Sequence, residues 1–218
     1  MKFFFKYSFL PNKKFNFVRQ SGFCNLYLVE NNLTMTSILP ALHTATLGTG
    51  CFWCTDAIFQ QLKGVESVTC GYSGGHLHNP TYEQVCGKQT GHAECLNIVY
   101  NPALLSFDEL LEVFWKSHDP TTLNRQGNDI GPQYRSVIFY HNEAQRSLAE
   151  KYKARLNTSD AYPNPVVTTL EPFTVFYPAE NYHQDYFNLR GSEPYCQLVV
   201  KPKVEKFEKI FRDKLKGN

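Results

Sequence analysis

The stretch ATLGTGCFWCTDAIFQQLKG, residues 45–64, predicts the first strand–helix unit of the fold. Residues 45–50 read as a strand that runs into a glycine turn at Gly50. Residues 51–64 carry apolar side chains at helical spacing and end at a second glycine, which predicts a helix. A strand that turns directly into a helix places Cys51 at the corner between them.

Outward from this unit, strands and helices alternate along the chain. Strands are predicted at 65–75, 93–102, 136–141 and 166–172, and helices at 79–85, 106–118, 143–156, 179–189 and the C-terminal end. Several connections between successive strands are too short for a regular doubly wound parallel sheet. We therefore predict an α+β fold, as a two-layer α/β sandwich around a βαβ unit, ferredoxin-like, in a single domain.

Length and composition agree with one folded domain and exclude several classes of function. The chain has 218 residues, 42% of them hydrophobic, and contains no long linker rich in proline, glycine or serine. A formal net charge of +2 is too small to indicate nucleic-acid binding or attraction to a membrane surface. No stretch approaches the roughly 20 apolar residues that span a bilayer. Nothing in the sequence requires more than a monomer.

Residues 1–34 have a different composition from the rest of the chain. No acidic residue precedes Glu30, and basic residues are interleaved with aromatic ones. Lys6 interrupts the first apolar run and no small-residue cleavage site follows, so a secretory signal is not indicated. Two interpretations stay open: an organellar transit segment, or an extension before a functional start at Met35. The folded domain is predicted over 35–218.

The seven cysteines are irregularly spaced, which is not the pattern of a secreted disulfide framework. We therefore expect a reducing, cytoplasmic location, unless residues 1–34 direct the chain to an organelle. Unsatisfied N–H groups at a helix start favour a thiolate, so a lowered pKa is predicted for Cys51. From this pattern alone Cys51 is either a reactive thiol or a buried apolar side chain.

Cys54 completes a CxxC pair with Cys51, a spacing that can close a disulfide. A zinc site would need two further ligands, and the sequence has no second CxxC or histidine pair, so no metal is predicted. Elsewhere, Glu94 would act as an acid at neutral pH if it lay in an apolar pocket, with Tyr82 as a second donor. Asp129 and Tyr134 occur in a polar loop, 124–136.

Five segments together are similar to the A-type peptide-methionine sulfoxide reductases. They are GCFWC (50–54), GYSGG (71–75), NPTYEQVCGKQTGHAE (79–94), NDIGPQYRS (128–136) and AENYHQDYF (179–187). The resemblance runs from about residue 45 to the C-terminus and makes 35–218 the catalytic domain. It implies reduction of the S epimer of free or protein-bound methionine sulfoxide, and hence repair of oxidised proteins. It also implies that no metal or organic cofactor is used and that thioredoxin is the reductant.

The resemblance assigns a role to each residue that matches the family's motifs. Cys51 is the expected nucleophile, which becomes a sulfenic acid, and Phe52 and Trp53 the pocket for the substrate's methyl group. The resemblance implies that the sulfoxide oxygen accepts hydrogen bonds from Glu94, Tyr82 and Tyr134. Asp129 is expected to help organise this site through water.

Two cysteines are candidates for the resolving thiol, which attacks the sulfenic acid of Cys51. Cys54 is favoured over Cys196, because a thiol one helical turn away closes a smaller loop. Cys196 stays the alternative, since it lies in the C-terminal region where many family members keep a recycling cysteine. Two other functions stay open: a thiol–disulfide oxidoreductase that uses Cys51 and Cys54 alone, and a binding module whose aromatic pocket recognises methionine-containing peptides. The first leaves the glutamate and the two tyrosines unexplained.

Overall fold

The corner between the first strand and the first helix is present in the computed structural model, which describes residues 41–217. Strand β1 (His43–Thr49) leads into Gly50, whose φ of +93° suits glycine. A Cβ at this position would lie 2.5 Å from the side chain of Gln126. Helix α1 (Phe52–Phe59) starts at once, with Cys51 as its N-cap. It ends earlier than predicted, before the turn that contains Gly64.

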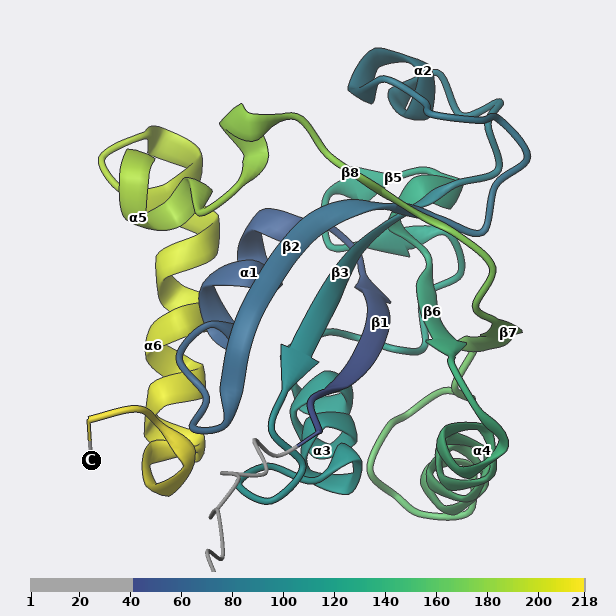
Figure 1. Cartoon of the computed structure of the whole chain (residues 1–218), viewed down its shortest axis with the longest axis vertical. Helices are drawn as coiled ribbons and strands as arrows, with labels where there is room; N and C mark the ends of the chain where they lie inside the picture. Colours follow the sequence, from purple (N-terminus) through teal and green to yellow (C-terminus); the bar gives the residue numbers. More distant parts are fainter. Residues whose placement is uncertain (1–40, 218) are drawn as a thin grey trace, which may run out of the picture. The chain divides into compact units, whose positions relative to one another are not determined.

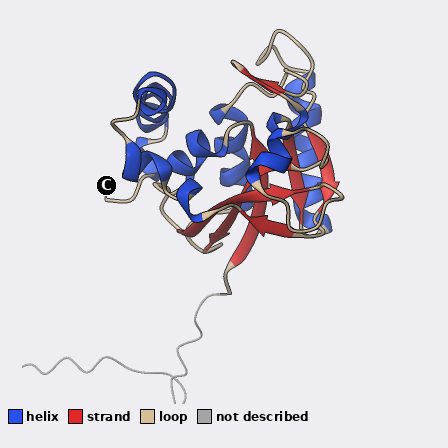
Figure 2. Cartoon of the chain, turned by 90° about the horizontal axis from the view of Figure 1, so that it is seen from above, coloured by secondary structure: helices blue, strands red, loops and turns tan. Residues whose placement is uncertain are grey.

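A six-stranded sheet forms the centre of the fold, in the order β7-β6-β1-β3-β2-β8. The remaining strands are β2 (Val65–Ser73), β3 (Ala93–Tyr100), β6 (Ser136–Tyr140), β7 (Thr169–Pro172) and β8 (Phe176–Pro178). All neighbours are antiparallel except β6 and β7, so the sheet is mixed. Figure 2 shows it as one curved layer with helices packed against it. The α+β prediction is confirmed.

Strand β3 lies between β1 and β2 and is antiparallel to both, so β1 and β2 are parallel to each other. The βαβ unit of β1, α1 and β2 is therefore split by the strand that follows it. This arrangement brings the start of α1 close to the start of β3, where residue 94 is paired with Tyr72 of β2.

The other helices follow the predicted order. They are α2 (Tyr82–Cys86), α3 (Phe107–Ser117), α4 (Glu143–Asn157), α5 (Tyr186–Arg190) and α6 (Lys201–Ile210), with a π-helical segment (Cys196–Val200) before α6. A capping box begins α3, with the Ser106 side chain accepting a hydrogen bond from the Glu109 backbone N–H. In Figure 1, α6 runs beside α1, which it contacts.

The core lies between the sheet and helices α1 and α3. Its largest fully buried side chains include Tyr72, Phe52, Phe59 and Phe114. Burial of such a side chain stabilises a fold by about 1.5–3 kcal/mol. Phe52 and Phe59 belong to α1, so the helix that carries the cysteine pair is fixed against the sheet by its own apolar residues.

Three features differ from the prediction. Strand β8 was not predicted, and the loop 124–136 contains a small hairpin of β4 (Arg125–Gln126) and β5 (Asp129–Ile130), followed by a 3-10 turn (Pro132–Tyr134). The helix predicted at 179–189 is two short pieces, because Asp185 adopts φ +52° between a 3-10 turn (Asn181–His183) and α5. The predicted extension, 1–34, lies outside the described residues. Within the described range, no helix has the length and apolar character needed to cross a bilayer.

Candidate active site

A small cavity of about 110 Å³ brings the predicted site residues together. Its lining consists of Cys51, Phe52, Trp53, Tyr82, Glu94, Asp129, Tyr134 and Tyr195. Seven of these eight come from the sequence prediction, and they arise from α1, α2, β3, β5 and the 3-10 turn at 132–134. Residues far apart in sequence thus surround one space beside the Cys51 thiol.

The start of α1 lies beside the carboxyl group of Glu94, which lines the same cavity as the Cys51 thiol. The backbone N–H of Phe52 donates to Oε2 of Glu94 at 3.2 Å, so one free N–H of the helix start is used by this carboxyl. The thiol of Cys51 is 9% exposed. Its hydrogen bond to Cys54 raises the pKa of Cys51, and burial and the nearby Glu94 raise it further. The predicted lowering of the Cys51 pKa is therefore wrong for the resting site.

Glu94 has the electrostatics of an acid at neutral pH. Its side chain is 2% exposed, and burial raises the pKa of the carboxyl to about 8. The Phe52 N–H opposes this rise, whereas the negative charge of Asp129 adds to it. The carboxyl is thus mostly protonated at pH 7, the state in which it can donate a proton into the cavity.

The two predicted tyrosines are neutral hydrogen-bond donors. Burial raises the pKa of Tyr82 and of Tyr134, and the charge of Glu94 acts in the same direction on both. Phenols that stay protonated can donate to a polar oxygen in the cavity. Asp129 lines the cavity beside Tyr195. Its Oδ2 accepts a hydrogen bond from the Tyr195 hydroxyl at 3.4 Å.

Tyr195 was not singled out from the sequence. Its hydroxyl lies 3.9 Å from Sγ of Cys54, and its ring meets Trp53 edge-on with centroids 5.7 Å apart. The residue thus contacts both the cysteine pair and the aromatic wall. The signal that could have indicated it is its position directly before Cys196, the alternative resolving cysteine.

Cys54 is the more acidic thiol of the pair. A hydrogen bond from Cys51 lowers the pKa of Cys54 to about 7, against the effect of burial, and the charge of Lys203 lowers it further. Cys51 and Cys54 occupy the N-cap and the third position of α1, one turn apart on one face. The alternative thiol, Cys196, is fully buried at the start of the π-helical segment. No disulfide joins any cysteines in the described part.

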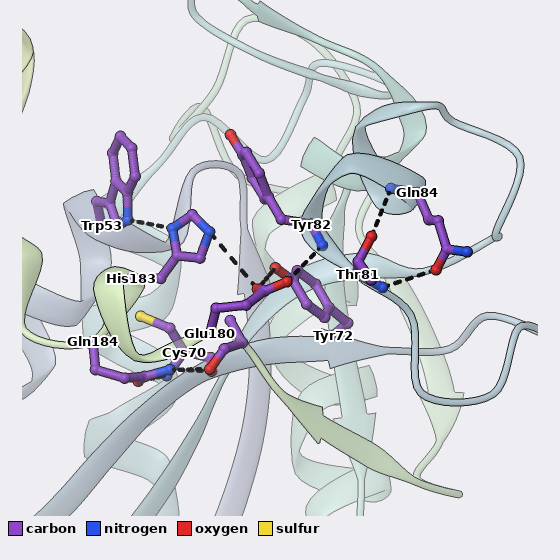
Figure 3. Close-up of polar contacts among 10 residues, drawn as sticks. Trp53, Cys70, Tyr72, Thr81, Tyr82, Gln84, Glu180, His183 and Gln184 are labelled. Carbon is purple, nitrogen blue, oxygen red and sulfur yellow. Dashed lines mark hydrogen bonds and ion pairs between the residues drawn. The ribbon is translucent and has the colours of Figure 1, made fainter.

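The indole of Trp53 is held by a chain of polar contacts (Figure 3). Its Nε1–H donates to Nδ1 of His183 at 3.1 Å. Because an indole N–H can only donate, Nδ1 is an acceptor and the ring proton lies on Nε2. Nε2 faces Oε2 of Glu180 at 3.9 Å, and burial lowers the pKa of His183, so the ring stays neutral. His183 therefore holds the Trp53 indole as a hydrogen-bond acceptor.

Glu180 connects this chain to the opposite wall of the cavity. Its carboxylate accepts hydrogen bonds from the Tyr72 hydroxyl at 3.0 Å and from the backbone N–H of Tyr82 at 2.9 Å. On the other side, Trp53 stacks on Tyr186 with centroids 3.8 Å apart. The short segment 180–186 therefore holds one cavity residue on α1 and another on α2.

Comparison with known proteins agrees with this geometry. The sequence model of the peptide methionine sulfoxide reductase family matches residues 43–215. The chain belongs to this family. It is 55% identical to peptide methionine sulfoxide reductase MsrA 1 of Rhodopirellula baltica, over 87% of this chain and 97% of the relative. It is 54% identical to the MsrA of Saccharolobus solfataricus, over 80% of this chain and 98% of the relative.

Solved structures of the family have the same fold. The reduced form of Mxr1 from Saccharomyces cerevisiae superposes with a TM-score of 0.63 at 33% identity, over 71% of this chain and 89% of that one. Methionine sulfoxide reductase A of Corynebacterium diphtheriae gives 0.62 at 34% identity, over 70% and 76%. The chain is therefore a thiol-dependent reductase of methionine sulfoxide. Among residues 41–217 no three His, Cys, Asp or Glu side chains gather as metal ligands.

Proposed function

We propose that the residues around the cavity reduce the S epimer of methionine sulfoxide, free or in proteins, with Cys51 as nucleophile. The observation that carries this proposal is the neutral carboxyl of Glu94, which shares one small cavity with the Cys51 thiol. A sulfoxide sulfur is a poor electrophile until its oxygen is protonated or strongly hydrogen-bonded. A protonated carboxyl and two phenols supply those donors in a site with little water.

In the first step the sulfoxide oxygen is placed against Glu94, Tyr82 and Tyr134. The substrate's methyl group lies against Phe52 and Trp53, an apolar and aromatic wall suited to a methylthio group. Cys51 loses its proton and forms a bond to the sulfoxide sulfur while Glu94 protonates the oxygen. The hydroxyl group then passes to the Cys51 sulfur as both bonds of the substrate sulfur, to oxygen and to Cys51, break. The thioether leaves, Cys51 is a sulfenic acid, and the proton that the thiol lost restores the Glu94 carboxyl. The sulfoxide gains two electrons and the thiol loses two.

In the second step a thiol attacks the sulfenic acid and water leaves. We assign this step to Cys54, because it interacts with Cys51 across one turn of α1 and has a pKa of about 7. Residues at these two helix positions are close enough for a disulfide without a large backbone movement. Cys196 is the alternative, and it lies in the adjoining π-helical segment.

In the third step an external dithiol reduces the disulfide by exchange. We propose thioredoxin as this dithiol. Mxr1, whose reduced form resembles this chain, has also been solved in complex with Trx2. The three steps use only side chains of this chain and an external thiol, so we propose that no metal or organic cofactor takes part. We further propose that the enzyme acts as a monomer in the cytoplasm.

The strand order also supports a finer description of the fold. Strands β6, β1, β3 and β2 lie side by side in that order, and each is antiparallel to its neighbours in this group. Helices α1 and α3 connect successive members of this group. We infer a ferredoxin-like arrangement for these four strands, with β7 and β8 added at the edges.

The experiment is reduction of each epimer of a blocked methionine sulfoxide, driven by dithiothreitol. Consumption of the S epimer alone supports the proposal. Consumption of both epimers contradicts the proposed stereochemistry, and consumption of neither contradicts the activity. A parallel assay for disulfide reduction with no sulfoxide present tests the alternative thiol–disulfide oxidoreductase.

A further inference from the structure

Lys203, on the C-terminal helix α6, contacts Cys54 and is not part of the cavity lining. Its Nζ donates to Sγ of Cys54 at 3.5 Å. The side chain is partly buried, and no carboxylate in the described range comes within ion-pair distance of it. The nearest charge partner that the geometry offers this ammonium is therefore the sulfur of Cys54.

The titratable groups around Cys54 come from every element packed against it. They are Cys51 on α1, Tyr195 before the π-helical segment, Cys196 within it, Lys203 on α6 and Glu94 on β3. Cys51 and Tyr195 are hydrogen-bond donors, and Glu94 is neutral at pH 7. Lys203 is the one cation among these groups. His118 adjoins Lys203 and stays neutral, because burial lowers its pKa to about 4.

We propose that Lys203 acts in the second step of the reaction by holding Cys54 as a thiolate that attacks the sulfenic acid of Cys51. This inference rests on the proposed function, in which Cys54 is the resolving cysteine. A thiolate is the nucleophile in such an exchange, and a fixed ammonium 3.5 Å away stabilises it with little screening in a buried site.

The step balances as follows. Cys54 first loses its proton to the solvent. Its thiolate then forms the S–S bond with Cys51, the S–OH bond breaks, and the leaving hydroxide recovers that proton from the solvent, so the net leaving group is water. Sulfur of Cys54 is oxidised and the sulfenic sulfur is reduced. The negative charge on Cys54 is lost in this step, so the ammonium of Lys203 stabilises the thiolate more than the disulfide. Lys203 therefore increases the fraction of Cys54 that is thiolate at neutral pH, and it also lowers the nucleophilicity of that thiolate.

A consequence concerns the first step. The negative charge on Cys54 raises the pKa of Cys51 and keeps its proton in place. If Lys203 is removed, Cys54 is less ionised and Cys51 becomes easier to deprotonate. The two steps should then respond differently: the second step slows and the first does not. A general loss of structure would slow both.

The test compares the full chain with Lys203→Met, Lys203→Arg and, as a matched control, Lys206→Met. Lys206 lines the same cavity of about 390 Å³ as Lys203, one turn further along α6, but is not among the groups that contact Cys54. Thiolate absorbance is titrated in the ultraviolet, with the Cys54→Ser protein subtracted. Rapid quench with one equivalent of methionine S-sulfoxide and no reductant then gives methionine release and Cys51–Cys54 disulfide formation.

In Lys203→Met the Cys54 midpoint should rise by about one pH unit. Disulfide formation should fall about three-fold at pH 6, since a roughly ten-fold loss of thiolate is partly offset by higher nucleophilicity. The difference should vanish near pH 7.5 and reverse at pH 9.5, where both thiolates are fully formed and the more basic thiolate of the variant reacts about three-fold faster. Methionine release should not slow at any pH. Lys203→Arg should retain most of the effect of the native lysine, and Lys206→Met should behave as the native protein.

An unchanged Cys54 midpoint in Lys203→Met overturns the proposal, as does an equal slowing of disulfide formation at every pH. If Lys203→Met releases no methionine, Lys203→Gln is judged by the same criteria. These results are distinct from failure of the proposed function, which would appear as no methionine release from the native chain.

Discussion

The backbone N–H of Phe52 points at the Glu94 carboxyl, 3.2 Å away, and not at the thiol of the preceding residue. The corner between β1 and α1 was expected to stabilise a Cys51 thiolate through the free backbone N–H groups of the helix start. One of these N–H groups is bound to the buried carboxyl, so fewer are available to stabilise the thiolate. The resting site therefore holds two protonated groups, Cys51 and Glu94, on either side of the space for the sulfoxide. We therefore expect Cys51 to lose its proton only after the substrate binds.

Glu94→Gln should slow the first step by about a hundred-fold or more, because the amide cannot give a proton to the sulfoxide oxygen. Single-turnover release of methionine measures this step. Glu83→Gln, an exposed acid on α2, is the matched control and should stay within about two-fold of the native rate. An unaffected rate in Glu94→Gln would show that the proton comes from another group.

The pH dependence of the same step follows from the pKa of Glu94, which burial raises to about 8. The carboxyl is protonated below this pH and loses its proton as the pH rises through it. The rate of methionine release should therefore have a descending limb centred near pH 8. The limb should be absent in Glu94→Gln. A native profile that rises through pH 9 without a decline would contradict the role of Glu94 as the acid.

Cys54→Ser should release one equivalent of methionine and then stop, because the sulfenic acid on Cys51 lacks its partner. Cys196→Ser should keep full turnover with thioredoxin. Both variants are measured for the initial equivalent and for the steady state that follows. Sustained cycling of Cys54→Ser together with arrest of Cys196→Ser would transfer the resolving role to Cys196.

His183→Phe keeps an aromatic ring beside Trp53 but removes the acceptor of the indole N–H. We expect kcat/KM for methionine sulfoxide to fall about five-fold, equivalent to about 1 kcal/mol for one lost hydrogen bond. His78→Phe, at an exposed histidine, should have little effect. In a Trp53→Phe background the change at His183 should cost little. Additive losses in this double-mutant cycle would mean that His183 does not act through Trp53.

Ser106→Ala should lower the free energy of unfolding by about 1 kcal/mol, because the N-cap oxygen of α3 is lost. Urea denaturation measures the change. Ser106→Thr keeps an oxygen at the cap and should recover most of the stability. Equal stability of all three proteins would show that the capping box contributes nothing to the fold.

Much of the site could be predicted because its residues lie in short motifs with local structural meaning. Gly50 marks the turn that places Cys51 at the start of α1, and its positive φ agrees with that role. The motif around Glu94 puts a carboxyl on a buried strand, where desolvation raises its pKa. These consequences follow from local sequence and burial.

The features that were missed depend on long-range contacts. The three residues of β8 form a strand only because they pair with β2, about a hundred residues earlier. Asp185 interrupts the predicted helix because it adopts a left-handed backbone conformation. Aspartate tolerates this conformation, but the local sequence gives no signal for it. The Cys51 pKa was mispredicted because its hydrogen bond with Cys54 and its burial raise it more than the helix start lowers it.

The central claim is that oxygen passes from substrate to Cys51 and that Cys54 then captures this sulfur. Its most direct test treats the fully reduced chain with one equivalent of methionine S-sulfoxide in the absence of reductant, blocks remaining thiols by alkylation, and maps the disulfide by mass spectrometry. The account predicts one equivalent of methionine and a bond between Cys51 and Cys54. A bond between Cys51 and Cys196, or a full set of alkylated thiols with no methionine released, would contradict it.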